Sequence, residues 1–249
     1  MERNSTGVRV DVSEHSVPKT GGGTGVLEAR LFAPRFTALG ADAAVDKVAV
    51  EAKGNCALVL HQYSVMGGSQ DLMRGLARRV AMHGVPALTF NFSGVGRSGG
   101  RASFTGHREV DDVVSAGRFL EVAGFTHVLL LCSSAGCAIG GSALDRLPLF
   151  TGYVALGYTF GNAASILFGS HFDAVLASCK PKLFVQGDRD EFTSAAQLTG
   201  WAVPRSNSAV TEARILPGVS HFELEGAAWD EQAASWAVEF ATRVGALRL

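Results

Sequence analysis

Residues His127–Gly141 read HVLLLCSSAGCAIGG, an apolar run that stops at a serine between small residues and then resumes. The first half has the composition of a buried strand, and the second half continues as a helix. A serine at the turn between such a strand and helix has a strained backbone and exposes its hydroxyl above the sheet. The segment therefore predicts a nucleophile, Ser134, although Cys132 occupies a position where glycine is more usual.

Apolar runs alternate with segments of helical periodicity along the chain, which is typical of a parallel sheet wrapped by helices. Two early strands are predicted to form an antiparallel start, at 8–12 and 26–33. Six more are predicted at 56–60, 85–91, 127–132, 151–156, 181–186 and 212–216. Helices are predicted at 70–83, 107–123, 134–144, 193–201 and 229–244. We expect one α/β domain over residues 1–249, with an eight-stranded, mostly parallel sheet and helices on both faces.

Two segments lack this clear alternation. Residues 34–55 are small and alanine-rich, and we expect a loop there. Residues 157–180 scatter apolar side chains among glycines, so any lid there is short, with one or two short helices and no separate cap domain. The apolar side chains of this segment predict a pocket for apolar acyl or alcohol groups, namely Tyr158, Phe160, Leu167 and Phe168.

The charge balance excludes several classes of partner. The chain has 22 basic and 23 acidic residues and a net charge of −1, so no basic surface for nucleic acid or an anionic membrane is expected. No apolar run approaches the roughly 20 residues that a membrane-spanning helix needs. No basic and then apolar leader is visible at the start. We therefore expect a cytoplasmic protein with a small-molecule substrate, and the sequence does not indicate an oligomeric state.

The cysteines and histidines do not suggest a metal or cofactor. The four cysteines lack zinc-type spacing and are expected to be free buried thiols, namely Cys56, Cys132, Cys137 and Cys179. The histidines form no His-Glu-x-x-His pair. The acidic residues Glu109, Asp111 and Asp112 lie on a predicted helix and are expected to form a solvated face.

A nucleophilic serine needs a base and a group that orients the base. An apolar strand ends in an acidic loop that contains Asp188 and Asp190, and His221 follows the last predicted strand. An imidazole can take the serine proton and return it to the leaving group, and a carboxylate fixes its tautomer. Asp190 is our candidate acid and His221 our candidate base, although an aspartate just before a predicted helix also suits a helix cap.

From about Val26 to Val244 the chain resembles the α/β-hydrolase superfamily, and most of all its small, nearly capless serine hydrolases of the dienelactone-hydrolase and carboxylesterase type. The resemblance rests on the order Ser134, Asp190, His221, on the early His61 and Gly67-Gly68-Ser69, and on Asn91-Phe92-Ser93-Gly94-Val95-Gly96-Arg97-Ser98. The family pattern Gly-x-x-Asp favours Asp190 over Asp188.

The resemblance also implies an oxyanion hole built from two backbone N–H groups. One would come from Ala135, directly after the serine. The other would come from Tyr63, or from Gln62, because the stretch from His61 to Tyr63 departs from the common His-Gly form.

These features predict a metal-independent and cofactor-independent serine hydrolase that cleaves a small ester through an acyl-enzyme. Two alternatives stay open: a ligand-binding or signalling protein with little turnover, and acyl transfer to an acceptor other than water. The sequence does not separate esterase from thioesterase, lactonase, lipase or peptidase activity.

Overall fold

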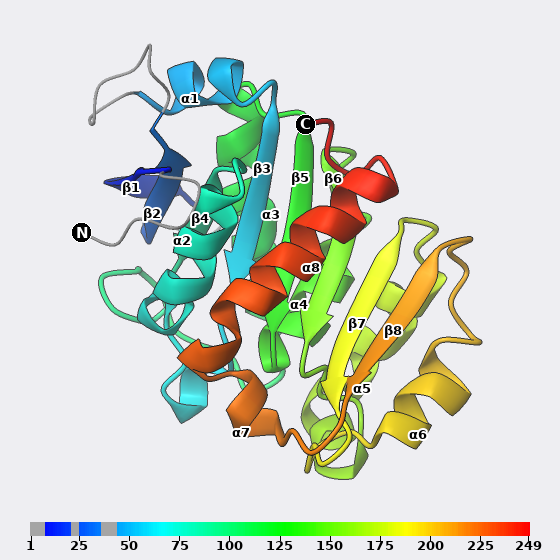
Figure 1. The fold of residues 1–249 in the computed structure, drawn as a ribbon. Coiled ribbons are helices and arrows are strands. Elements are labelled where there is room, and N and C mark those ends of the chain that lie inside the picture. Colours follow the sequence, from blue (N-terminus) through cyan, green and yellow to red (C-terminus); the bar gives the residue numbers. More distant parts are fainter. Residues whose placement is uncertain (1–7, 21–24, 36–43) are drawn as a thin grey trace.

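The computed structural model describes residues 8–20, 25–35 and 44–249. Its centre is one sheet with the strand order β1-β2-β4-β3-β5-β6-β7-β8 (Figure 1). The strands are β1 (Val10–Pro18), β2 (Val26–Pro34), β3 (Asn55–Leu60), β4 (Ala87–Phe90), β5 (His127–Ser133), β6 (Phe150–Leu156), β7 (Lys182–Gly187) and β8 (Thr211–Leu216). β2 is antiparallel to both β1 and β4, and the other neighbours are parallel. All eight predicted strands, including the antiparallel start, are confirmed.

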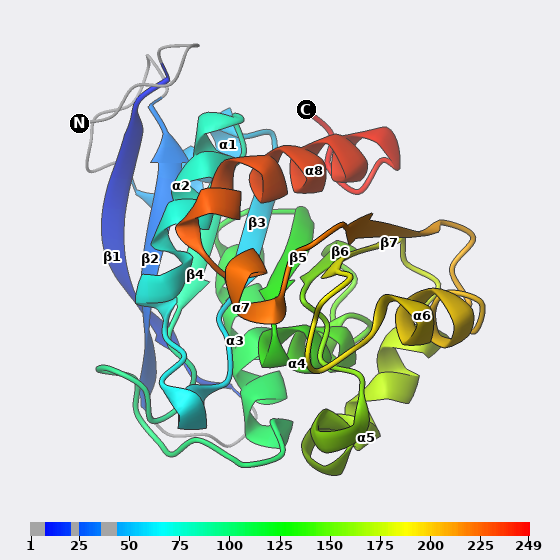
Figure 2. The same ribbon diagram turned by 60° about the horizontal axis from the view of Figure 1, so that its bottom comes forward.

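Helices cover both faces of the sheet (Figures 1 and 2). On one face α2 (Arg74–Met82) packs beside α8 (Asp230–Arg243). On the other face α4 (Ala135–Ala143) lies between α3 (His107–Val122) and α5 (Asn162–Ala177). The central strands are apolar throughout because successive side chains enter opposite cores: Leu130 belongs to one cluster, and Leu129 and Leu131 to the other. None of the helices formed by the described residues is long and apolar enough to cross a bilayer.

Several short helices complete the connections. They are α1 (Val45–Glu51), η1 (Ser64–Met66), η2 (Gln70–Met73), α6 (Ala195–Gln197), η3 (Leu198–Ala202), α7 (His221–Leu224) and η4 (Ala227–Trp229). The helix α1 corrects the loop predicted for 34–55, of which 36–43 lie outside the described residues. Val48 and Ala49 of α1 are buried in the core, so tertiary packing supports a helix that its alanine-rich sequence did not reveal.

The segment 157–180, predicted as a possible lid, contains the long helix α5. Its side chains Phe168, Phe172 and Val175 are buried in the same apolar cluster as α4. The helix therefore packs as part of the layer on this face of the sheet, which agrees with the expectation of a short or absent cap. Opening of α5 as a lid stays a prediction.

The prediction of a solvated acidic face on α3 is wrong for two of the three residues. Glu109 and Asp112 are buried, and only Asp111 is exposed. The carboxylate of Asp112 accepts hydrogen bonds from the amide and hydroxyl of Ser93, at 2.7 and 2.8 Å, and lies 3.3 Å from Nζ of Lys19. These two carboxylates are buried because α3 faces the loop after β4. Helical periodicity alone does not reveal this neighbour.

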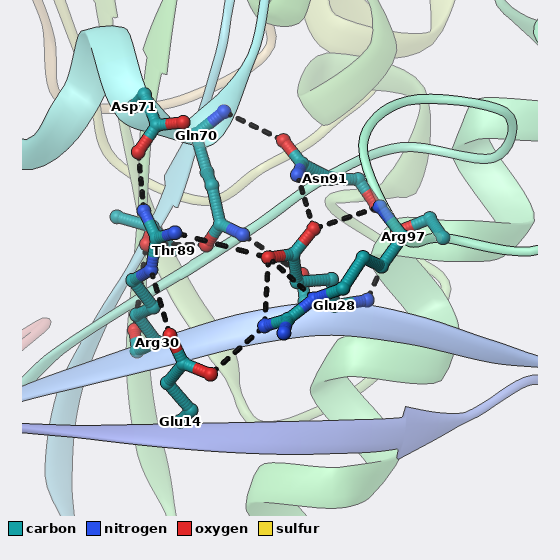
Figure 3. A network of polar contacts seen from close by, with 9 residues as sticks. Glu14, Glu28, Arg30, Gln70, Asp71, Thr89, Asn91 and Arg97 are labelled. Carbon is teal, nitrogen blue, oxygen red and sulfur yellow. Dashed lines mark hydrogen bonds and ion pairs between the residues drawn. The ribbon is translucent and has the colours of Figure 1, made fainter.

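A second polar network fixes the same loop, residues 91–98, to the antiparallel edge of the sheet (Figure 3). The carboxylate of Glu28 accepts hydrogen bonds from the side-chain amide of Asn91 and the backbone amide of Arg97, both at 2.9 Å. The side-chain oxygen Oδ1 of Asn91 in turn accepts from the backbone amide of Gln70 at 2.8 Å. The loop of residues 91–98 is thus tied to β2 and to the turn that precedes α2.

Candidate active site

Ser134 lies at the turn between β5 and α4 with φ 53° and ψ −125°. Positive φ is costly for a residue with a side chain, and here the surroundings enforce it. The Ser134 amide donates to the carbonyl of Leu156 on β6 at 2.9 Å, and its carbonyl accepts from the amide of Cys137 at 2.9 Å. The structure therefore gives Ser134 the strained conformation that the sequence predicts.

Two glycines of α4 allow this turn to lie close to its neighbours. A Cβ on Gly136 would be 2.4 Å from the backbone oxygen of His61, just after β3. A Cβ on Gly140 would be 2.5 Å from Sγ of Cys132. Cys132 therefore fits where a glycine is more usual, because Gly140 on α4 has no side chain to collide with its thiol.

The structure brings Ser134, His221 and Asp190 together from three separate strand ends. Oγ of Ser134 lies 2.8 Å from Nε2 of His221, and Nδ1 of His221 lies 2.6 Å from Oδ2 of Asp190. All three residues are buried. The other carboxylate oxygen of Asp190 accepts from the amides of Phe192 and Thr193, both at 2.8 Å, so this residue both caps the following turn and contacts the imidazole.

Asp188 has a different role from Asp190. Its Oδ1 accepts a hydrogen bond from the amide of Gly218 at 2.7 Å, which ties the loop after β7 to the loop after β8. His221 itself is held by the first turn of α7, where Ser220 forms a capping box with Glu223. The backbone amide of His221 also donates to the carboxylate of Glu191 at 3.0 Å.

A second carboxylate, that of Glu225, also faces the imidazole. Its Oε1 lies 3.3 Å from Nε2 of His221. Burial opposes a charge on the imidazole, but the hydrogen bond and negative charge of Asp190, together with Glu225, outweigh burial and raise the pKa of His221 to about 9. The sequence analysis missed Glu225 because it expected no helix before Trp229. The capping pattern from Ser220 to Glu223 predicts a helix there, which would place residues 221 and 225 on one face.

One candidate oxyanion donor, Ala135, directly follows Ser134 in the chain, and the other, Tyr63, lines the same pocket as Ser134. No hydrogen bond within the described residues uses the amide N–H of Ala135 or of Tyr63. His61, one residue beyond β3, is fully buried: its Nδ1 donates to the Gln62 carbonyl at 2.7 Å, and its Nε2 accepts from the amide of Phe92 at 3.2 Å. Burial lowers the pKa of His61 to about 4, so the neutral ring fixes the segment that carries Tyr63.

A pocket of about 150 Å³ opens at Ser134 and His221. Its walls are apolar with a few polar groups, and its lining includes Gln62, Tyr63, Met66, Leu72, Phe192, Phe222 and Glu225. None of the four residues that the sequence suggested for an apolar pocket lines it. Tyr158, Phe160 and Phe168 are buried in the core, and Leu167 packs against the same apolar cluster.

The cysteines near Ser134 are poor nucleophiles. Burial raises the pKa of Cys132 and of Cys137 well above the ordinary range of a thiol, so both stay protonated. Cys56 is also buried, whereas Cys179 is exposed, contrary to expectation. Among residues 8–20, 25–35 and 44–249, no cluster of three or more histidine, cysteine or carboxylate side chains could hold a metal ion.

No family model matches the sequence, and no curated protein sequence matches it. Solved structures do match its fold. A serine hydrolase homologue from Coxiella burnetii is 22% identical, with a TM-score of 0.69, and the match covers 90% of this chain and 96% of that one. A serine hydrolase without a lid from Xanthomonas campestris is 20% identical, with a TM-score of 0.68 over 92% and 94% of the two chains. An esterase from Pyrococcus furiosus is 14% identical, with a TM-score of 0.70 over 94% and 93%. The chain therefore has the α/β-hydrolase fold, as the resemblance implied.

Proposed function

We propose that this chain is a serine hydrolase that cleaves a small ester through an acyl-enzyme on Ser134. The observation that carries the proposal is the pair of hydrogen bonds from Ser134 to His221 and from His221 to Asp190, at 2.8 and 2.6 Å. A hydroxyl is a weak nucleophile at neutral pH, and this arrangement supplies both a proton acceptor and a carboxylate that fixes its tautomer. The esterase and serine hydrolases with the same fold support this choice.

In the first half of the proposed reaction, Oγ of Ser134 forms a bond to the ester carbonyl carbon, and its proton moves to Nε2 of His221. The amides of Ala135 and Tyr63 stabilise the oxyanion, and removal of one such donor typically costs on the order of 100- to 1,000-fold in turnover. The tetrahedral intermediate collapses when its carbon–oxygen bond to the alcohol breaks. The proton on Nε2 then passes to that alcohol oxygen.

In the second half, a water molecule attacks the acyl carbon and gives a proton to Nε2. Collapse of the second intermediate releases the acid and returns the proton to Oγ of Ser134. Nε2 must be neutral at the start of each half, which is the tautomer that the hydrogen bond from Nδ1 to Asp190 favours. The pocket of about 150 Å³ supports a small acyl or alcohol group.

The test is labelling with a fluorophosphonate probe, followed by peptide mass mapping, on the wild type, Ser134→Ala and Ser133→Ala. Ser133 is the matched control because it is also buried and directly precedes Ser134. We expect labelling of Ser134 in the wild type and in Ser133→Ala, and none in Ser134→Ala. A folded wild type that does not label would contradict the proposal and favour a ligand-binding role.

The alternative of acyl transfer is tested on the same protein. Hydrolysis of a p-nitrophenyl ester is measured with and without an added alcohol or thiol, and the acyl products are quantified. Hydrolysis predicts that the free acid stays the main product. A transferred acyl group as the main product at low acceptor concentration would contradict it.

A further inference from the structure

Glu225 follows His221 by one helical turn and directs a carboxylate oxygen at the same imidazole nitrogen that Ser134 contacts. Oε1 of Glu225 is 3.3 Å from Nε2, and the side chain is only 16% exposed. This oxygen is buried and makes no well-directed hydrogen bond to any described residue. Among the described residues its ion-pair contact is with the imidazole, and Glu225 lines the pocket beside Ser134.

This contact disfavours the neutral imidazole. A carboxylate oxygen only accepts hydrogen bonds, and Nε2 of a neutral ring whose Nδ1 carries the proton also only accepts. The carboxylate oxygen and the neutral Nε2 then lie 3.3 Å apart with no proton between them, in a buried site where charges are weakly screened. Protonation of Nε2 removes this conflict, because its N–H can then be shared between Oγ of Ser134 and Oε1 of Glu225.

The other charged groups around His221 do not offset this effect. Asp190, from the loop after β7, is a second carboxylate on the opposite ring nitrogen. Glu191, from the same loop, accepts from the backbone amide of His221. Glu223, on the outer side of α7, is engaged with Ser220 and faces Arg189. Cys137, which faces Glu225 from α4, stays a neutral thiol. In the described part of the chain, no cation is among the groups that shift the protonation of His221.

We propose that Glu225 is a positioning residue that holds His221 in its protonated form at neutral pH and thereby places the working range of the hydrolase at alkaline pH. This inference rests on the proposed function, because the rate depends on the protonation of His221 only if the reaction uses that ring as a base. Burial opposes the charge, but the two carboxylates outweigh it and raise the pKa of His221 to about 9, so activity is expected to grow as pH rises toward that value.

The experiment is the pH dependence of kcat/KM for p-nitrophenyl acetate between pH 5 and 10, with spontaneous hydrolysis subtracted, on the wild type and Glu225→Gln. Glutamine keeps the size of the side chain and removes its charge. The apparent pKa of the profile should fall by at least about one unit, which gives about a tenfold higher kcat/KM at pH 7. Glu223→Gln is the matched control on the same helix, since glutamine also completes a capping box, and its profile should match that of the wild type.

A second measurement does not depend on turnover. The imidazole of His221 is titrated by NMR in the wild type, Glu225→Gln and Ser134→Ala, and the same fall is expected only in Glu225→Gln. An unchanged pKa in Glu225→Gln overturns the inference, as does a loss of activity at every pH without a shift. If the wild type neither labels nor hydrolyses but the titration shifts as expected, the proposed function fails and the electrostatic role of Glu225 stands.

Discussion

The close approach of α4 to the end of β3 makes Gly136→Ala a sharp test of how the site is built. A Cβ at this position would lie 2.4 Å from the His61 oxygen, where ordinary contact begins at 3.4 Å, so the two segments must separate by about 1.0 Å, the difference of the two distances. All three atoms closer than 3.4 Å are backbone atoms, the oxygen and carbon of His61 and the oxygen of Leu60, and they cannot rotate away. The turn that carries Ser134 and the segment that carries Tyr63 must therefore move apart.

Gly136→Ala is expected to lower both the free energy of unfolding and the activity. Overpacking of this kind usually destabilises by about 1–3 kcal/mol, and the gain from alanine in place of glycine in a helix, at most about 1 kcal/mol, offsets only part of it. Activity should suffer more than stability, because the displacement separates the proposed nucleophile from one proposed oxyanion donor. A misplacement of about 1 Å can cost on the order of 100-fold in rate.

The assay is urea denaturation together with kcat/KM for p-nitrophenyl acetate on the wild type, Gly136→Ala and Gly200→Ala. Gly200 is the control because no atom lies within 4 Å of its added Cβ, so its stability should change by less than about 1 kcal/mol. A Gly136→Ala protein with wild-type stability and wild-type kcat/KM would contradict this prediction. It would mean that the contact between α4 and the His61 backbone does not position the site.

Two further predictions concern buried ionisable groups. In Asp190→Asn the amide can donate where the carboxylate accepted, which favours the wrong tautomer of His221, and kcat should fall on the order of 10⁴-fold; unchanged turnover at preserved circular dichroism would exclude the orienting role. Lys182 donates hydrogen bonds to the carbonyls of Ser178 and Lys180, and burial lowers its pKa to about 8 against the negative charge of Asp145. Between pH 8 and 10.5 the unfolded state binds more protons at this residue than the folded state, so Lys182 contributes a rise in the free energy of unfolding with pH, of up to roughly 3 kcal/mol. Urea denaturation at pH 7.5 and 10 should show this rise in the wild type relative to Lys182→Met, and equal pH dependence in the two proteins would contradict it.

The sheet and the position of Ser134 follow from local patterns in the sequence. Each central strand is an uninterrupted apolar run because helices cover both faces, and such runs are visible without knowledge of their partners. The turn at Ser134 is local, since the small residues that permit it are its own neighbours. Chain order then pointed to Asp190 and His221, each just after a predicted strand, because parallel strands bring their carboxyl ends to one edge of the sheet.

Which side chains face each other at this edge of the sheet depends on the folded chain. The burial of Asp112 depends on Ser93 and Lys19, which are distant in the sequence. The pocket takes its walls from the turns near Tyr63 and Phe222 rather than from α5. The pairing of Glu225 with His221 depends on α7, a helix of four residues that is too short to show apolar periodicity in the sequence. Periodicity reports how one segment meets a core, whereas pKa values and pocket shape depend on distances between segments, which only the folded chain sets.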